Sequence, residues 1–226
     1  METKKYKKIL IHKVKDSAEK YYTKKAQLFD LPAKVAVVGA SQRSGKTNWI
    51  INALGKPNMY SKDFLPENIY IFSPSLKSNK WVRFIKDEYN EAVRENRKPA
   101  NKVIVFDDLG FGGSLRGKSK FGVMDALVMN GRHYNLSTFF LVQSYKQLSP
   151  DVRGNLSGLV VFNVSTRELD QIVYEHNYLP SSKDFMKLFR DTTKKKHSYF
   201  VINYSNDTQD IYMDSNFRPV RVVADK

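Results

Sequence analysis

Residues 35–49 read VAVVGASQRSGKTNW and carry the clearest structural signal in the chain. The first four residues form a short continuous apolar run, which is typical of a strand buried on both faces of a sheet. Gly45, Lys46 and Thr47 follow, and a helix is expected from Gly45 to about residue 54. A strand, a glycine-containing loop and a helix in this order are the setting of a phosphate-binding loop, whose pattern is G-x-x-x-x-G-K-[ST].

This loop departs from that pattern by one residue. Counting back from Gly45 places Ala40, and not Gly39, at the position of the first glycine. Either Ala40 replaces this glycine or the loop carries one inserted residue after Gly39. Both arrangements leave backbone N–H groups at the positive end of a helix dipole, where phosphate binds. We therefore expect ATP or another nucleoside triphosphate to bind through these residues: Gln42, Arg43, Ser44, Gly45, Lys46, Thr47 and Asn48.

Two acids complete a second motif, VIVFDD, in which the apolar run 103–106 ends in Asp107 and Asp108. An acid at the tip of such a strand is typical of a Walker B element, although aspartate is also common in an exposed turn. We expect Lys46 to neutralise phosphate charge and Thr47 and Asp107 to hold Mg²⁺. Asp108 is then the general base or the residue that orients water for hydrolysis.

A third polar group follows the predicted strand STFFLV at residues 137–142. Gln143 comes directly after this run, at the carboxyl end of a predicted buried strand. Ligands of parallel sheets bind beyond the carboxyl ends of the strands. Gln143 therefore fits the role of a sensor that reaches the γ-phosphate or its attacking water, the alternative being a surface glutamine.

The whole chain alternates between apolar runs and helical stretches, which predicts an α/β fold with a mainly parallel sheet. Further strands are expected at 68–73, 102–106 and 159–164, and further helices at 78–97, 121–131 and 165–177. HSYFVINY and QDIYM, joined by residues 205–208, predict a β-hairpin. We expect a basic N-terminal arm at 1–30, partly helical around 16–28, an ATPase core at 31–180 and a C-terminal extension of a helix and the hairpin at 181–226.

Composition narrows the classes of partner. The formal net charge of +15 over 226 residues favours a polyanion as partner. The absence of cysteine excludes disulfides, thiolate zinc sites and cysteine nucleophiles. No apolar stretch approaches the ~18 residues of a transmembrane helix, and residues 1–15 lack the apolar core of a signal peptide. We expect no membrane segment.

The stretch from about Lys34 to His176 resembles the FtsK/HerA-type P-loop motor ATPases, and in particular the genome-packaging ATPases of large double-stranded DNA viruses and virophage-like elements. The resemblance rests on GASQRSGKTN, on VIVFDD and on NGRHYNLSTFFLVQSYKQLSPDVRGNLSGLVVFNV at residues 130–164. Asp108 departs from the cell-division motors, which usually carry glutamate at this position.

The resemblance implies a RecA-like core that hydrolyses ATP with Mg²⁺ and works as a ring of five or six copies. Such rings thread double-stranded DNA through a central channel without reading its sequence. Arg132 matches the arginine that enters the ATP site of the neighbouring subunit, and Arg153 is the second candidate; Arg132 is alternatively a cation at a helix C-terminus. The resemblance also implies work in the cytoplasm of an infected cell or in the virion, and it leaves capsid proteins open as partners.

A ring motor needs cationic loops that face its channel. Two segments fit, residues 112–120 after the Walker B strand and residues 144–153 after the sensor strand. Both are expected to contact backbone phosphates of DNA. Their predicted DNA-binding residues are Arg116, Lys118, Lys120, Lys146 and Arg153.

Three other functions compete with a packaging motor. A small P-loop kinase would need an acceptor pocket and a lid in place of an arginine from a second subunit. A DNA-export ATPase of the zonula-occludens-toxin type usually carries a transmembrane segment. A DNA-binding scaffold would bind ATP without turning it over.

Overall fold

The computed structural model describes residues 22–25, 28–40, 44–73, 101–108 and 123–222. They form one seven-stranded sheet in the order β2-β3-β4-β1-β5-β6-β7. The strands are β1 Lys34–Val38, β2 Phe64–Phe72, β3 Asn101–Asp107, β4 Leu136–Val142, β5 Gly158–Phe162, β6 Tyr199–Asn203 and β7 Tyr212–Met213. Neighbouring strands from β2 to β5 pair in parallel, whereas β6 and β7 are antiparallel. This confirms the predicted α/β fold with its mainly parallel sheet and C-terminal antiparallel strands.

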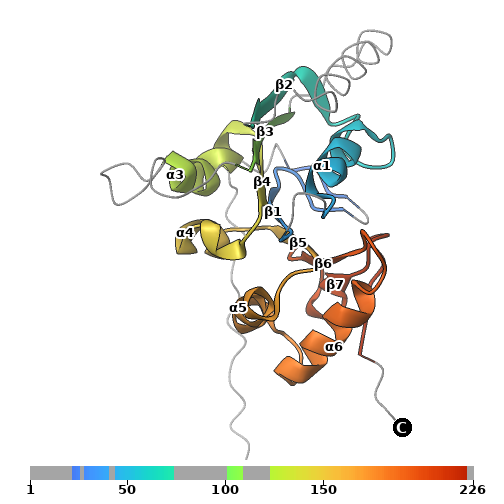
Figure 1. The fold of residues 1–226 in the computed structure, drawn as a ribbon. Coiled ribbons are helices and arrows are strands. Elements are labelled where there is room, and N and C mark those ends of the chain that lie inside the picture. Colours follow the sequence, from blue (N-terminus) through green and yellow to red (C-terminus); the bar gives the residue numbers. More distant parts are fainter. Residues whose placement is uncertain (1–21, 26–27, 41–43, 74–100, 109–122, 223–226) are drawn as a thin grey trace, which may run out of the picture.

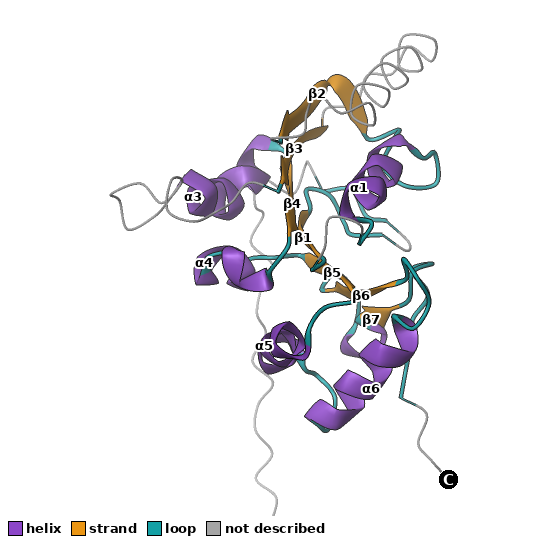
Figure 2. Cartoon of the chain, viewed as in Figure 1, coloured by secondary structure: helices purple, strands orange, loops and turns teal. Residues whose placement is uncertain are grey.

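Helices lie on both sides of this sheet (Figures 1 and 2). The helices are α1 Lys46–Gly55, α3 Val123–Asn130, α4 Pro150–Gly154, α5 Thr166–His176 and α6 Ser182–Thr192. Short 3-10 helices are η2 Gly131–Tyr134, η3 Tyr145–Gln147 and η4 Thr208–Asp210. From residue 34 onward, the strands and helices expected from the sequence in the described residues are present, with bounds shifted by a few residues. The predicted helix at 78–97 lies outside the described residues.

Alternation of side chains along each strand divides the core into two parts. Val35 and Val37 of β1 pack with Trp49 and Ile50 of α1 on one face. Ala36 and Val38 face the opposite way and pack in a second cluster with side chains of α3, α4, α5 and α6. Because both faces of β1 are covered, all four apolar residues of the VAVV run are fully buried. Burying a valine contributes roughly 1.5–3 kcal/mol, so this run anchors the loop that follows it.

The chain on either side of the predicted core also enters the sheet or its packing. Leu28 and Phe29, inside the predicted basic arm, are buried in the α1-side cluster. Residues 22–25 are not helical, and Thr23 forms a β-bridge with Leu31, so the partial helix predicted around 16–28 is wrong over these residues. The hairpin of β6 and β7 extends the main sheet through β5. The domain boundaries at residues 30 and 180 stay predictions.

Candidate nucleotide site

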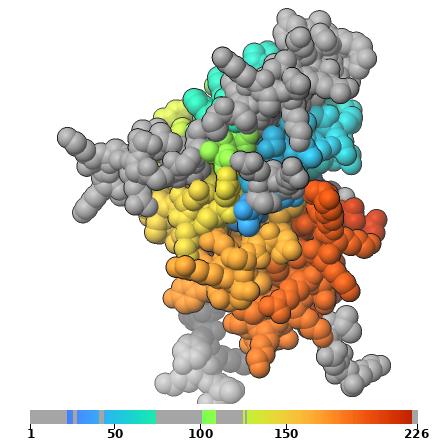
Figure 3. All heavy atoms as spheres, in the orientation of Figure 1, coloured from blue at the N-terminus to red at the C-terminus, as the bar shows by residue number. Residues whose placement is uncertain are grey.

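β4 lies between β1 and β3, so the three polar segments predicted from the sequence meet at one edge of the sheet. The chain leaves β1 into the phosphate loop, β3 into Asp107 and Asp108, and β4 into Gln143. The blue, green and yellow atoms of these parts of the chain adjoin one another in the space-filling view (Figure 3). The order of strands therefore brings residues that are far apart in the sequence to one place.

Glycine is required at two positions of the phosphate loop. A side chain on Gly39 would place its Cβ 2.5 Å from Ser44 Oγ and 2.8 Å from Ser44 Cβ. Gly45, which precedes α1, has φ +113°, in the region that favours glycine. Ala40, by contrast, is exposed. Of these two residues it is Gly39 that lies against Ser44 and leaves no room for a side chain. Gly39 therefore corresponds to the first glycine of the pattern, which favours an inserted residue after it over a replacement by Ala40.

Lys46 is held inside this loop. Its Nζ donates to the Gly39 carbonyl oxygen at 2.8 Å and to Ser44 Oγ at 3.4 Å, and the residue is only 6% exposed. Burial lowers the pKa of its ammonium, and the nearby carboxylates of Asp108 and Asp107 oppose that shift. Both acids are therefore close enough to act electrostatically on Lys46.

The two acids differ in their surroundings. Asp107 is 3% exposed and accepts a hydrogen bond from Ser73 Oγ at 3.1 Å, a contact that the sequence did not predict. Asp108 has φ +52°, so the backbone leaves the extended conformation at this residue. Its backbone N–H still donates to the Leu141 carbonyl at 3.0 Å. The turn at Asp108 explains how two successive residues of a strand both act on Lys46, because successive side chains of an extended strand point to opposite faces.

Gln143 contacts the second acid directly. Its side-chain Nε2 donates to Asp108 Oδ1 at 2.7 Å. Its backbone N–H donates to the side-chain oxygen of Gln147 at 3.0 Å, and Ser144 N–H donates to the same oxygen at 3.1 Å. The residue expected to act as sensor is therefore held at both its side chain and its backbone.

Glu168 of α5 fixes the segment after Gln143. Its carboxylate accepts from Ser144 Oγ and from Tyr145 N–H, each at 2.8 Å. Glu168 lies in the first turn of this helix, where Ser165 is the N-cap. The capping pattern Ser144-x-x-Gln147 was the available sequence signal for this rigid turn.

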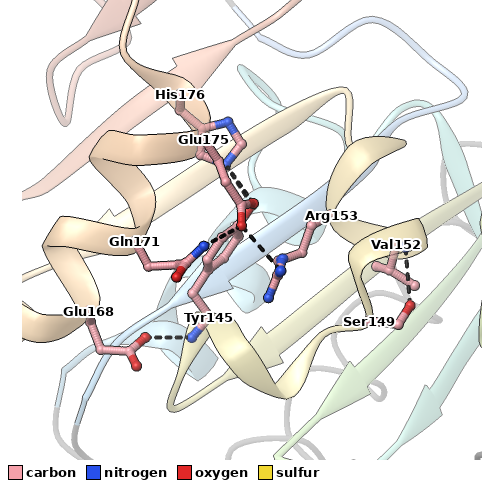
Figure 4. Close-up of polar contacts among 8 residues, drawn as sticks. All are labelled: Tyr145, Ser149, Val152, Arg153, Glu168, Gln171, Glu175 and His176. Carbon is pink, nitrogen blue, oxygen red and sulfur yellow. Dashed lines mark hydrogen bonds and ion pairs between the residues drawn. The ribbon is translucent and has the colours of Figure 1, made fainter.

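A buried polar network continues from Tyr145 (Figure 4). Tyr145 Oη donates to Glu175 at 2.8 Å and lies 2.5 Å from His176 Nε2. Tyr204 Oη contacts the other ring nitrogen of His176. Burial lowers the pKa of His176 to about 4, with Glu175 opposing the shift and Arg153 adding to it. The imidazole is consequently neutral near pH 7.

Arg153 belongs to this network. Its guanidinium forms an ion pair with Glu175 at 3.1 Å and lies 5.2 Å from the centre of the Tyr145 ring (Figure 4). This arrangement turns the side chain toward the protein interior and is different from the open surface expected of a DNA contact. Its predicted roles as a DNA contact or as the inter-subunit arginine remain predictions.

The remaining predicted site residues are dispersed. Arg132 is exposed in η2, at the opposite end of β4 from Gln143. Lys146 is exposed in η3, which follows the same end of β4 as Gln143. Thr47 is half-buried and Asn48 exposed in the first turn of α1. Five predicted site residues lie outside the described residues: Gln42, Arg43, Arg116, Lys118 and Lys120.

The site fits a magnesium-bound nucleotide by its chemistry. Across the described ranges, no group of three or more His, Asp or Glu side chains could hold a metal ion. Mg²⁺, however, is usually bound by one or two carboxylates, several waters and the phosphates of the substrate. A buried aspartate beside a buried lysine and a threonine at the start of α1 meets that requirement. Thr47 and Asp107 are the residues that would hold the ion.

The comparison with protein families settles the relationship. The model of the family described as Poxvirus A32 protein matches residues 82–224. This chain belongs to the Poxvirus A32 protein family. The match confirms the resemblance to viral genome-packaging ATPases that the sequence motifs indicated.

Individual relatives are more distant. The DNA packaging protein OPG160 of vaccinia virus (strain Copenhagen) is 24% identical over 190 residues, which cover 75% of this chain and 67% of that protein. The genome packaging NTPase B204 from Sulfolobus turreted icosahedral virus 2, solved in complex with sulfate, has a TM-score of 0.51 at 14% identity, covering 80% of this chain and 94% of that one. The B204 match supports the fold. B204 has also been solved with ATP-gammaS, at a TM-score of 0.46, 16% identity and 77% and 93% coverage.

In the part of the chain that the structure describes, no helix combines the length and the apolar character that a membrane-spanning helix needs.

Proposed function

We propose that this chain is the ATPase of a viral genome-packaging motor, which uses ATP hydrolysis to move double-stranded DNA. One observation carries the proposal: Lys46, Asp107, Asp108 and Gln143 gather at one edge of the sheet in a member of the Poxvirus A32 protein family. The vaccinia relative is named as a DNA packaging protein, and B204 as a genome packaging NTPase.

The residues divide the chemistry among them. Backbone amides at the start of α1 and the Lys46 ammonium bind and neutralise the phosphates. Thr47 and Asp107 would hold Mg²⁺, which when bound supplies positive charge to the phosphates during transfer. Asp108 accepts a proton from the attacking water, and Gln143, through its hydrogen bond to Asp108 Oδ1, orients that carboxylate.

DNA contact and assembly are further parts of the proposal. The net charge of +15 favours a phosphate backbone as partner, and Lys146 is exposed three residues after Gln143. A contact there would connect DNA to the turn that carries the sensor glutamine. The proposed assembly is a ring of five or six copies in which Arg132 acts on a neighbouring ATP site. The proposed location is the cytoplasm of an infected cell or the virion.

The decisive test is ATP hydrolysis measured against protein concentration, with and without double-stranded DNA. The motor predicts a specific activity that rises steeply with protein concentration, because each site needs a second copy, and that rises further with DNA. The Lys46→Ala variant should lose turnover under all conditions. DNA-stimulated hydrolysis that persists in Lys46→Ala would remove the proposal.

A matched control shows whether the loss of turnover comes from the position of Lys46 or from the loss of any one positive charge. Lys62→Ala removes an exposed lysine that lies just before β2 and should keep full turnover. A small P-loop kinase would instead show activity that is independent of protein concentration and of DNA. A scaffold would bind ATP tightly without hydrolysing it.

A further inference from the structure

A large cavity adjoins the phosphate loop on the α1 side of the sheet. It has a volume of about 700 Å³. Ligand sites for small molecules typically measure ~300–1,000 Å³. Its lining includes Gly45, Asn48 and Trp49 from the start of α1, and Phe162, His197 and Asn216 from later in the chain. Any group attached to a phosphate held at Gly45 and Lys46 therefore has this space beside it.

The C-terminal segment forms one wall of the cavity. In Figure 3 the orange atoms of this segment adjoin the blue and cyan atoms of the first part of the core. His197 Nδ1 lies 3.5 Å from the Ser44 carbonyl oxygen, so the imidazole stands at the edge of the phosphate loop. The ring of Phe162 is so close to Gly45 that a Cβ on that glycine would lie 3.1 Å from its Cε1. The cavity thus begins where the phosphate loop ends.

Specific contacts hold this wall in place. Tyr199 Oη donates to the Ser215 carbonyl at 2.8 Å, and Tyr199 N–H donates to Ser215 Oγ at 2.9 Å. His197 and Phe217 both have positive φ values, of +65° and +57°, which are uncommon for residues other than glycine. Such backbone conformations persist only where the surrounding structure fixes them. Both residues line the cavity, so the surrounding structure fixes the backbone of this wall.

The lining chemistry suits a nucleoside. An imidazole and aromatic rings offer surfaces for a base, whose stacking on aromatic side chains is favourable for every base. The amides of Asn48, Asn52 and Asn216 carry both hydrogen-bond donors and acceptors, as do the edges of a base and the hydroxyls of a ribose. Lys25 lines the same space, but its Nζ is bound to Asp63 at 2.5 Å. Lys56 lines the cavity as well, so the lining combines polar and stacking groups with one exposed cation.

We propose that this cavity binds the base and ribose of the nucleoside triphosphate, and that the C-terminal segment at His197 and 215–217 supplies the wall against the nucleoside. The inference rests on the proposed function, because it needs the phosphates at Gly45 and Lys46. It extends the nucleotide site from the loop near the start of the chain to a segment about 150 residues later, as the Ser44–His197 contact shows.

The experiment compares a nucleotide with its phosphates alone. The affinities of AMPPCP and of inorganic tripolyphosphate, each with Mg²⁺, are measured by calorimetry on the full chain. The wild-type chain should bind AMPPCP more tightly than tripolyphosphate. His197→Ala should weaken AMPPCP about five- to tenfold, the lower end of the range for a lost stacking contact, and leave tripolyphosphate within twofold. His133→Ala, which removes an exposed histidine of η2, is the matched control and should change neither affinity.

A second variant tests the cavity at a residue other than His197, because His197 also contacts the phosphate loop at Ser44. Asn52→Trp adds bulk from α1 into the cavity without altering residues 44–47. It should weaken AMPPCP and leave tripolyphosphate unchanged. The unfolding midpoint of each variant is measured to show that the fold is kept.

The outcomes separate this inference from the proposed function. Equal binding of AMPPCP and tripolyphosphate by the wild-type chain would overturn the nucleoside cavity and keep the phosphate site. Loss of both ligands to the same degree in His197→Ala, or of neither in both variants, would also overturn it. Binding of neither ligand by the wild-type chain would overturn the proposed function as well.

Discussion

At its C-terminal end β4 leads into Gln143, whose amide donates to Asp108, whereas its N-terminal end follows the exposed turn that holds Arg132. Seven residues of β4 separate these ends, a distance of roughly 23 Å at about 3.3 Å per residue. That is far beyond the reach of one side chain. The lysine, the two acids and the glutamine of the proposed site thus belong to one end of the strand. If Arg132 acts on a triphosphate, it acts on that of another copy.

The largest expected effect concerns the exposed end of β4. Arg132→Ala should lower the turnover number by about 10³–10⁵, the range for an arginine supplied to a phosphoryl-transfer site. A mixture of Arg132→Ala with Lys46→Ala should regain activity, because some interfaces then pair an intact loop with an intact arginine. Steady-state hydrolysis of the two variants alone and mixed provides the measurement. A mixture as inactive as its components would assign Arg132 to a structural role.

At the other end of β4, Asp108→Asn tests the chemistry of the second acid. Loss of a general base should lower the turnover number by about 10²–10⁴ and leave nucleotide affinity nearly unchanged. Asp151→Asn, at an exposed aspartate of α4, is the control and should keep full activity. A reduction of less than tenfold would move the role of base away from Asp108.

A smaller effect is expected in the network behind Gln143. His176 is surrounded by Tyr145, Tyr204, Glu175 and Arg153, and burial lowers its pKa from 6.5 to about 4. Between these pH values the unfolded chain binds more protons than the folded one, so the free energy of unfolding falls as pH falls from 6.5 toward 4. The loss contributed by this residue is about 3 kcal/mol and is complete below pH 4.

Denaturant unfolding at pH 7 and at pH 4.5 measures this effect. His176→Gln removes the titrating group and should show a smaller loss between these pH values than the wild-type chain. His133→Gln, at an exposed histidine, should lose as much stability as the wild type. An equal pH dependence in the wild type and in His176→Gln would show that His176 is not held neutral by its surroundings.

The smallest effect is expected at Lys146, the exposed cation nearest to Gln143 in the sequence on the C-terminal side. Lys146→Ala should reduce the slope of log K for DNA binding against log salt by about one. Lys183→Ala, in α6, removes a lysine that is also exposed and should leave the slope unchanged. A wild-type slope in Lys146→Ala would show that this lysine makes no phosphate contact.

The principal strands and helices were readable from the linear chain, and so was the grouping of the motifs that form the proposed nucleotide site. VAVV, VIVF and FFLV are continuous apolar runs within the central strands β1, β3 and β4, and each polar motif follows its run directly. Local patterns of this kind survive folding because they reflect the neighbours of each residue along the chain. The hairpin was predicted for the same reason, but its pairing with β5 was not.

Contacts between distant segments were set by the three-dimensional arrangement. Three such contacts could not be predicted from the sequences of the segments that they join. They are the position of β4 between β1 and β3, the hydrogen bond from Tyr145 N–H to Glu168 and the ion pair of Arg153 with Glu175. An arginine followed by glycine reads equally well as a DNA contact or as a buried cation until its partner is known. The sequence near the phosphate loop was thus sufficient to locate it. The groups that surround the loop were decided by tertiary packing, because burial and pairing depend on segments that come together only when the chain folds.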